Sequence, residues 1–426
     1  MNFLATNISN FRNIALRVGF TFFIICLYRF AVFVPLPGID LEVLSSFISK
    51  KMDGSLFRIF NSFSGKALEQ MSIMSLWLGP YISSSIVIQL LSSSIPRLKE
   101  LKKDGASGQA KLKQYTRYLT LALAVFQSYS IAFALEYMSD ANSSLVMYPG
   151  YFFKISTVIS MVGSTFLAMW FSEQITSRGI GNGSSILIFV NIISGTFYAF
   201  LQLLAGMFYG TSSFWMSIVY IAIVLGLILL IVTLESVIRP VTIQYPNQMN
   251  FIAKISKPEI PIKLNVSGVL PPMFAQIFLG FLMLGLNSIL SFFGLEYVKG
   301  FLSKESLNIL LKLFMIVFFA FVYASMVFNP EEVAENLQKS GAYIPGKLPG
   351  KKTQQFFESL INRVTFFGAV YLAFISLFPD IVLGRNSQMY VSGTSLLIVV
   401  GVTLEFFAHI GSYIASAKLK VGRFKR

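Results

Sequence analysis

The sequence predicts an all-α membrane protein with ten transmembrane helices, and three observations carry this prediction. Of its 426 residues, 55% are hydrophobic and only 12% are charged, about half the charged fraction of an ordinary soluble domain. Apolar runs of about 20 residues recur along the chain, and each is long enough to cross a hydrocarbon core of about 30 Å. Basic residues gather in alternate loops. A transmembrane barrel would instead need alternating segments of about ten residues.

The apolar runs set the expected spans in chain order. The first run lacks a small-residue cleavage site and leads into a proline-containing loop, so we expect a retained span rather than a signal peptide. The ten expected spans are residues 15–35, 72–92, 117–137, 152–172, 184–204, 213–236, 267–290, 307–328, 359–379 and 392–415.

Loop charges predict which way the spans run. The 92–117 loop has seven basic and two acidic residues, and the tail after the last span has five basic and no acidic residues. The loops that alternate with these are neutral or acidic: residues 35–71 hold four of each sign, and 136–150 hold two acids and no base. Because basic loops stay in the cytoplasm, both termini are expected there.

The residue inventory argues against catalytic chemistry. Cys26 is the only cysteine and His409 the only histidine, so neither an intrachain disulfide nor a His/Cys metal site is expected. A Ser-His or paired-Asp dyad at mid-span depth, which an intramembrane protease needs, is not evident. We therefore expect no catalytic residue, no metal and no cofactor, and energy supplied by a partner.

Three loops are long enough to carry function. Residues 235–265 contain short β-like pieces and predict a hairpin, and residues 329–357 open with Asn-Pro-Glu-Glu, a helix N-terminus. Both are expected to be docking surfaces. The third loop, on the opposite side, contains Leu56, Phe60 and Phe63 on one face of a short helix. The pattern alone leaves an interfacial helix and a re-entrant helix equally open.

Three spans carry helix-disturbing residues. Pro80 and three consecutive serines lie in the second span, Pro271 and Pro272 lie about one turn into the seventh, and a glycine-rich stretch opens the fifth. Helix–helix packing absorbs small residues in many bundles. Three softened helices together favour a cavity with wet vestibules, because irregular backbone at membrane depth survives only against protein or water.

Eight stretches, in order and over nearly the whole chain, resemble the SecY family of protein-conducting channels. They are PLPGID at 35–40, FSGKALEQMSIMSLWLGPYISSSIVIQLL at 63–91, QYTRYLTL at 114–121, QITSRGIGNGSSILIF at 174–189, KLNVSGVLPP at 263–272, NPEEVAENLQKSGAYIPG at 329–346, NRVTFFGAVYLAFI at 362–375 and GTSLLIVVGVTLE at 393–405.

The resemblance implies an hourglass of two pseudo-symmetric five-helix halves, residues 1–204 and 205–415, followed by a basic tail at 416–426. A ring of aliphatic side chains would close the waist, and a plug helix at 54–63 would lie beneath it. A lateral gate would lie between the second and seventh spans. By position, the ring is Leu78, Ile82, Ile188, Ile192, Met273 and Ile398; the plug carries Leu56, Phe57, Ile59, Phe60 and Phe63; and the gate holds Ser84, Gln89, Gln127 and Asn265.

The resemblance also implies a function and partners. The chain would translocate unfolded secretory polypeptides and insert membrane proteins laterally, in a bacterial plasma membrane or an inner membrane of an organelle of bacterial descent. Implied partners are SecE-like and SecG-like small subunits, a ribosome or the SecA motor, signal-sequence-bearing polypeptides and lipids. Docking residues would be Arg239, Lys347, Lys351 and Lys352.

Two departures from the family pattern bear on the motor. The last long loop usually reads Pro-Gly-Ile-Arg-Pro-Gly, but here Leu348 takes the place of the arginine, with Lys347 beside it. The middle loop keeps only Arg239 of a basic pair. Both departures predict altered SecA coupling.

A secondary transporter is the alternative reading, because broken helices also occur in that class. Transporters hold ionisable groups near the midplane, whereas the mid-span positions here are aliphatic. Uptake of small solutes by vesicles would separate the two functions.

Overall fold

The computed structural model describes residues 2–40, 43–44, 61, 64–137, 145–209, 214–245, 258–292, 305–382 and 392–423. Within these ranges nine helices are long and apolar enough to cross a membrane. The predicted seventh span coincides with α10 (Leu270–Phe292), in which Leu270–Gly280 forms a shorter apolar helical stretch. The prediction of a multi-pass helical membrane protein is confirmed.

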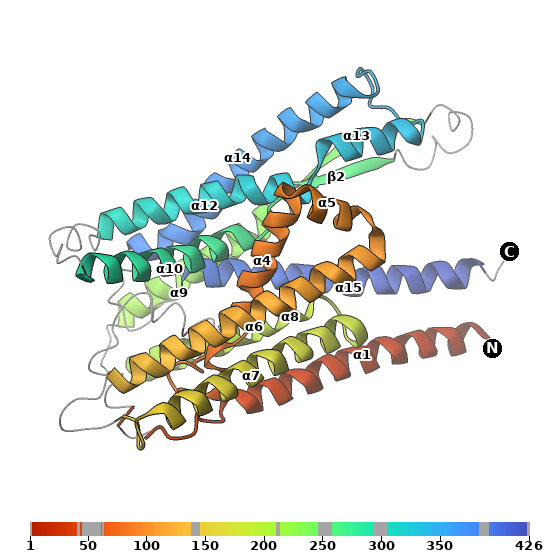
Figure 1. Ribbon diagram of the computed structural model, residues 1–426. Coiled ribbons are helices and arrows are strands. Elements are labelled where there is room, and N and C mark those ends of the chain that lie inside the picture. Colours follow the sequence, from red (N-terminus) through yellow and green to blue (C-terminus); the bar gives the residue numbers. More distant parts are fainter. Residues whose placement is uncertain are drawn as a thin grey trace. The chain divides into compact units, whose positions relative to one another are not determined.

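The chain folds into two compact units, residues 1–206 with 402–426, and residues 207–401. Figure 1 shows the helices of both units. Unit 1 contains α1 (Asn2–Val32), the 3₁₀ helix η1 (Ile73–Leu76), α4 (Gly79–Ser94), α5 (Pro96–Lys103), α6 (Gly105–Tyr137), α7 (Tyr151–Arg178), most of α8 (Gly183–Phe208) and the later part of α15 (Gly393–Arg423). Unit 2 contains α9 (Phe214–Glu235), β1 (Ile238–Thr242), β2 (Glu259–Lys263), α10 (Leu270–Phe292), α12 (Glu305–Val327), α13 (Pro330–Lys339), α14 (Lys351–Val382) and the start of α15.

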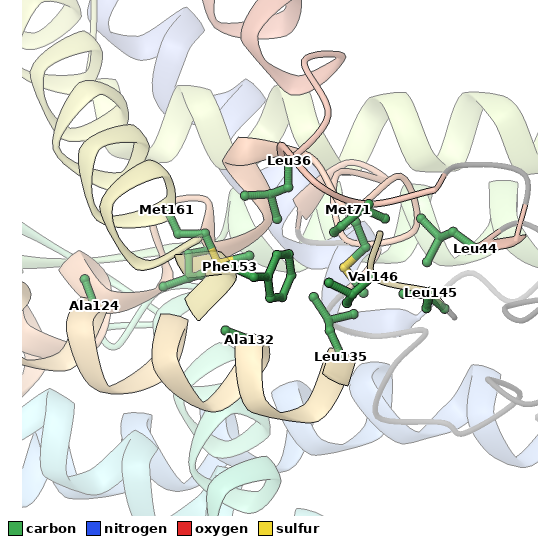
Figure 2. Packing of buried hydrophobic residues seen from close by; sticks show 12 residues of the cluster. Leu36, Leu44, Met71, Ala124, Ala132, Leu135, Leu145, Val146, Phe153 and Met161 are labelled. Carbon is green, nitrogen blue, oxygen red and sulfur yellow. The ribbon is translucent and has the colours of Figure 1, made fainter. Parts of the chain in front are cut away.

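Helix α6 is the central packing element of unit 1, lying against α4, α5 and α7. Ala124, Ser128 and Ala132 are fully buried and recur every four residues along it. Such small side chains let neighbouring backbones approach closely, which is how membrane helices pack without a hydrophobic driving force. Figure 2 shows Ala132 and Leu135 of α6 in one cluster with Phe153 of α7.

Ion pairs join α6 to α7 near both ends. Arg117 Nη2 lies 2.6 Å from Glu173 Oε1, and Lys154 Nζ lies 2.9 Å from Glu136 Oε2. Glu136 also accepts a hydrogen bond from the Gly150 amide at 2.8 Å. The antiparallel register of the two helices is therefore fixed near both ends.

The two long loops of unit 2 fold together into one body, here called the loop module: β1, β2, α13 and the turn at residues 340–350. β1 and β2 form the predicted hairpin, with Arg239 opposite Ile262. Asn329 caps α13, as predicted, by accepting from the Glu331 amide at 3.2 Å. The amides and carbonyls of Gln244 and Tyr343 exchange two 2.9 Å bonds, which join one loop to the other. A buried apolar cluster centred on Phe357 lies beneath.

Candidate functional site

The helix of the second span is interrupted, but the interruption lies before Pro80 and not at it. Pro80 lies in the first turn of α4, where a proline removes no intrahelical hydrogen bond. The break falls just before it, between η1 and α4, where Trp77 adopts a φ of 42°. The predicted disturbance of the second span is therefore present, but it lies just before Pro80 and is not caused by the missing amide of that proline. Pro271 and Pro272 likewise fall in the first turn of α10.

The three serines of α4 are partly explained by local hydrogen bonds. Ser84 is buried, and its Oγ donates to the Pro80 carbonyl at 2.7 Å. Ser85 Oγ accepts from Gln89 Nε2 at 3.4 Å, and both of these side chains are at least partly exposed. Ser84 thus satisfies its hydroxyl within its own helix, while Ser85 and Gln89 present polar atoms at the surface of unit 1.

Four of the predicted ring residues belong to unit 1, and all four are buried. Leu78 caps α4, and Ile82 follows one turn later, its amide donating to the Leu78 carbonyl at 2.9 Å. Ile188 and Ile192 are also one turn apart, on α8. Each pair therefore presents two aliphatic side chains on one face of its helix.

The other two predicted ring residues belong to unit 2 and are also buried. Met273 follows closely on the start of α10, and Ile398 lies near the start of α15. These two helices contact each other, because Gln276 Oε1 accepts from Thr394 Oγ1 at 3.1 Å. In each unit, the predicted ring positions thus come from two helices near their starts.

The fifth and tenth spans, α8 and α15, both begin at a glycine that lies very close to the backbone of the preceding span. A Cβ added to Gly183 would lie 1.9 Å from the Ser172 carbonyl oxygen, and one added to Gly393 would lie 1.9 Å from the Ile375 carbonyl oxygen. At α8 the Gly183 amide also donates to Thr176 Oγ1 at 2.9 Å. The helices that carry Ile188 and Ile398 therefore each begin at a glycine that packs closely against the preceding span.

An anchor around Arg29 fixes the segment that enters the second span, and sequence reasoning missed it. Arg29 donates to Ser194 Oγ at 2.7 Å and to the Gly65 carbonyl at 3.3 Å. Gly65 has a φ of 65°, and a Cβ there would lie 2.7 Å from Arg29 Nη1. The available signal was an arginine inside an apolar run, which shows that a polar partner is needed but not which one. The anchor joins α1, α8 and the 64–72 segment.

Aromatic and amide groups complete this anchor. Lys66 Nζ lies 3.0 Å from the centroid of the Tyr198 ring, a cation–π contact. Burial lowers the pKa of the Lys66 ammonium, and Glu69 nearby opposes that effect. Behind them Asn191 Nδ2 donates to Tyr28 Oη at 2.7 Å. The residues next to the predicted plug are thus tied to two spans.

The predicted gate residues have different environments. Gln127 is half-buried on α6, and Gln89 is exposed on α4. Asn265 is buried in unit 2, where its amide nitrogen donates to Glu235 and to Gly268. The amide hydrogens of Asn265 are therefore used inside unit 2. A role for these residues in a lateral gate stays a prediction.

The predicted docking residues all lie on or next to the loop module and are exposed. Arg239 is on β1, and Lys351 and Lys352 start α14. Lys347 Nζ lies 5.6 Å from the ring centroid of Phe356. Leu348 is 62% exposed, although Thr353 Oγ1 donates to its carbonyl at 2.9 Å. An exposed apolar side chain, that of Leu348, thus lies among the exposed basic residues of this segment.

Part of the expected site falls outside the described residues. The predicted plug side chains Leu56, Phe57, Ile59, Phe60 and Phe63 all lie there. Among the residues that the structure describes, no group of three or more His, Cys, Asp or Glu side chains is placed to hold a metal ion.

Comparisons with known proteins agree with this architecture. A family model for SecY matches residues 72–407. The protein translocase subunit SecY of Rickettsia bellii is 41% identical over 411 residues, covering 94% of each chain. That of Escherichia coli K12 is 38% identical over 413 residues, covering 94% of this chain and 92% of its own.

Solved structures share the fold at low sequence identity. One described as a protein conducting channel has a TM-score of 0.68 at 14% identity, covering 94% of this chain and 93% of its own. Sec61 in a canine ribosome–channel complex from the endoplasmic reticulum has a TM-score of 0.65, with the same coverage and identity.

Proposed function

The chain belongs to the SecY family, and we propose that it is the channel subunit of a protein translocase, which conducts unfolded polypeptides across a membrane and releases apolar segments sideways into lipid. The observation that carries the proposal is the set of buried aliphatic pairs at helix starts, Leu78 with Ile82 on α4 and Ile188 with Ile192 on α8.

Such side chains suit a seal around a moving chain. A narrow aliphatic constriction loses its water and so blocks ions without a charged gate. It offers no hydrogen bond to any passing residue, so it has no preferred cargo sequence. Met273 fits the same task, because its flexible thioether fills irregular gaps. In this proposal Leu78, Ile82, Ile188, Ile192, Met273 and Ile398 are the ring residues that the resemblance implies.

A plug and a lateral gate complete the proposed channel. Residues 54–63 form the plug, and the Arg29 anchor supports this assignment because it fixes the chain at Gly65, immediately after them. Ser84, Gln89, Gln127 and Asn265 belong to the gate. A signal sequence leaves through it because each buried methylene is worth about 0.8 kcal/mol.

The loop module is the proposed docking site for the motor or the ribosome, and it lies in the cytoplasm with both termini. Its exposed basic residues Arg239, Lys347, Lys351 and Lys352 support this placement, since positive loops stay inside. SecE-like and SecG-like subunits accompany the chain in a bacterial plasma membrane or an inner membrane of an organelle of bacterial descent.

Reconstitution tests the proposed function directly. Vesicles that contain the chain with SecE-like and SecG-like subunits are supplied with SecA, ATP and an unfolded protein with or without a signal sequence. Protease-protected cargo should accumulate only when the signal is present. Uptake of small solutes without protein uptake would instead establish a secondary transporter.

Replacing Leu348 with arginine is expected to raise the rate of SecA-driven translocation by roughly five- to tenfold, because one charge-assisted hydrogen bond adds about 1–1.4 kcal/mol. Arginine is the residue that the family pattern places there, and Leu348 is exposed enough to reach a partner. The measurement is the initial rate with SecA of Escherichia coli.

Leu348→Lys is the matched control, since it adds the charge without the planar fork and should gain less. Equal rates for the wild type and both variants would show that position 348 does not contact the motor.

A further inference from the structure

The chain enters α10 through a compact polar joint, made of Glu235, Asn265, Ser267 and Gly268. Asn265 Nδ2 donates to Glu235 Oε1 at 2.6 Å and to the Gly268 carbonyl at 2.9 Å. Ser267 Oγ donates to Asn265 Oδ1 at 3.1 Å. Asn265 is 3% exposed, so these bonds are shielded from solvent and their loss is costly.

The joint connects three elements of unit 2. Glu235 is the last residue of α9, Asn265 follows β2, and Gly268 precedes α10 with a φ of 66°. The Leu264 amide donates to the Val237 carbonyl at 3.1 Å, which holds the hairpin beside the end of α9. α14 closes the other side, because a Cβ on Gly368 would lie 3.1 Å from the Leu264 carbonyl oxygen.

One carboxylate, that of Glu235, links the turn before α10 to the end of α9. The turn at residues 265–269 precedes the helical hydrogen bonds of α10 and has one weak backbone bond of its own, from the Gly268 amide to the Asn265 carbonyl at 3.4 Å. Gly268 adopts its φ of 66° readily because it has no Cβ. The acceptor in the Glu235–Asn265 bond is a carboxyl group, and a hydrogen bond to an ionised carboxylate is stronger than one between neutral groups. The Glu235–Asn265 bond is also the one that ties the turn to a different helix.

We propose that Glu235 is a positioning residue for α10: through Asn265 it fixes the angle at which the chain passes from the loop module into α10, and so sets how readily α10 moves when the channel opens. The inference rests on the proposed function, in which α10 is one side of the lateral gate. It assigns Asn265 to the joint in addition to the gate.

A weaker joint should reduce the free energy needed to move α10 when the channel opens. A signal sequence with a shorter apolar segment should then be sufficient to open it. Glu235→Gln keeps the shape of the side chain and removes the charge, so the fold is retained. The translocation rate of a cargo with a shortened apolar signal, divided by that of the same cargo with its full signal, should rise roughly five- to tenfold. Asn265→Ala should raise the ratio similarly, and the double variant should add little.

Two further variants make the test specific. Glu235→Gln combined with Asn265→Asp reverses donor and acceptor and should restore part of the wild-type ratio, while the Gly268 carbonyl stays without its donor. Glu100→Gln removes an exposed carboxylate from α5, outside the joint and the loop module, and should leave the ratio unchanged. The ratio is insensitive to how much channel folds, because both cargoes use the same vesicles.

The outcomes separate the inference from the proposed function. If the wild type translocates both cargoes and Glu235→Gln slows them equally, the joint is structural only and the inference fails. If the ratio falls, α10 is not released by a weaker joint and the inference also fails. If the wild type translocates neither cargo, the proposed function fails first.

Discussion

Replacing Ile192 with asparagine is expected to make vesicles that contain the idle channel leak ions roughly 10- to 100-fold faster than vesicles with the wild type. One amide in an aliphatic constriction lowers the cost of hydrating it by about 1–3 kcal/mol, and each 1.4 kcal/mol is a factor of ten. Ion flux without cargo, corrected for the amount of folded channel, measures the effect.

The adjacent residue provides the control. Ile193 is 40% exposed whereas Ile192 is fully buried, although the two are neighbours on α8. Ile193→Asn places the same amide on the outer surface of the helix and should leave the ion flux at the wild-type level. If folded Ile192→Asn channels remain as tight as the wild type, Ile192 is a packing residue and does not line the seal.

Replacing Gly183 or Gly393 with alanine is expected to reduce sharply the amount of folded protein. A Cβ at either position would lie 1.9 Å from a backbone carbonyl oxygen of the preceding span, Ser172 or Ile375. Backbone atoms cannot move aside as a side chain does, so the two spans must separate. Overpacking of this kind costs roughly 1–3 kcal/mol or more. Thermal unfolding of the purified protein in detergent measures the loss.

Two other helical glycines serve as controls, one in each unit. Gly163 of α7 and Gly226 of α9 have nothing within 4 Å of an added Cβ. Alanine there should be neutral or stabilising by up to about 1 kcal/mol, because glycine is the weaker helix former. Equal melting temperatures for all four variants would mean that the close contacts at Gly183 and Gly393 are not present in the protein.

The sequence predicted the helical architecture well because its signals are local. Apolar runs predicted the spans, the Asn-Pro-Glu-Glu stretch predicted the start of α13, and short β-like pieces predicted the hairpin. These depend on neighbouring residues only, so one chain is enough to read them. The prolines misled because a proline in the first turn of a helix and one within a span look alike in sequence.

Features that depend on contacts between residues far apart in the sequence were not predicted, or only one of the residues was identified. The Arg29–Gly65–Ser194 anchor joins residues up to 165 positions apart, and no local pattern pairs them. Asn265 was predicted to belong to the lateral gate, but its hydrogen bond to Glu235, 30 residues earlier, was not predicted. The close packing at Gly183 and Gly393 likewise requires knowledge of which carbonyl each glycine faces.

Site-specific crosslinking tests the central claim, that buried aliphatic residues line the path of the polypeptide. A photoreactive side chain is placed at Ile82 or Ile192, or at the surface positions Val87 and Ile193 on the same two helices. A signal-bearing chain is then stalled during translocation. Crosslinks to positions 82 and 192, with none to 87 and 193, are the predicted result. Crosslinks confined to 87 and 193, or a stalled chain that reaches none of the four, would contradict the account.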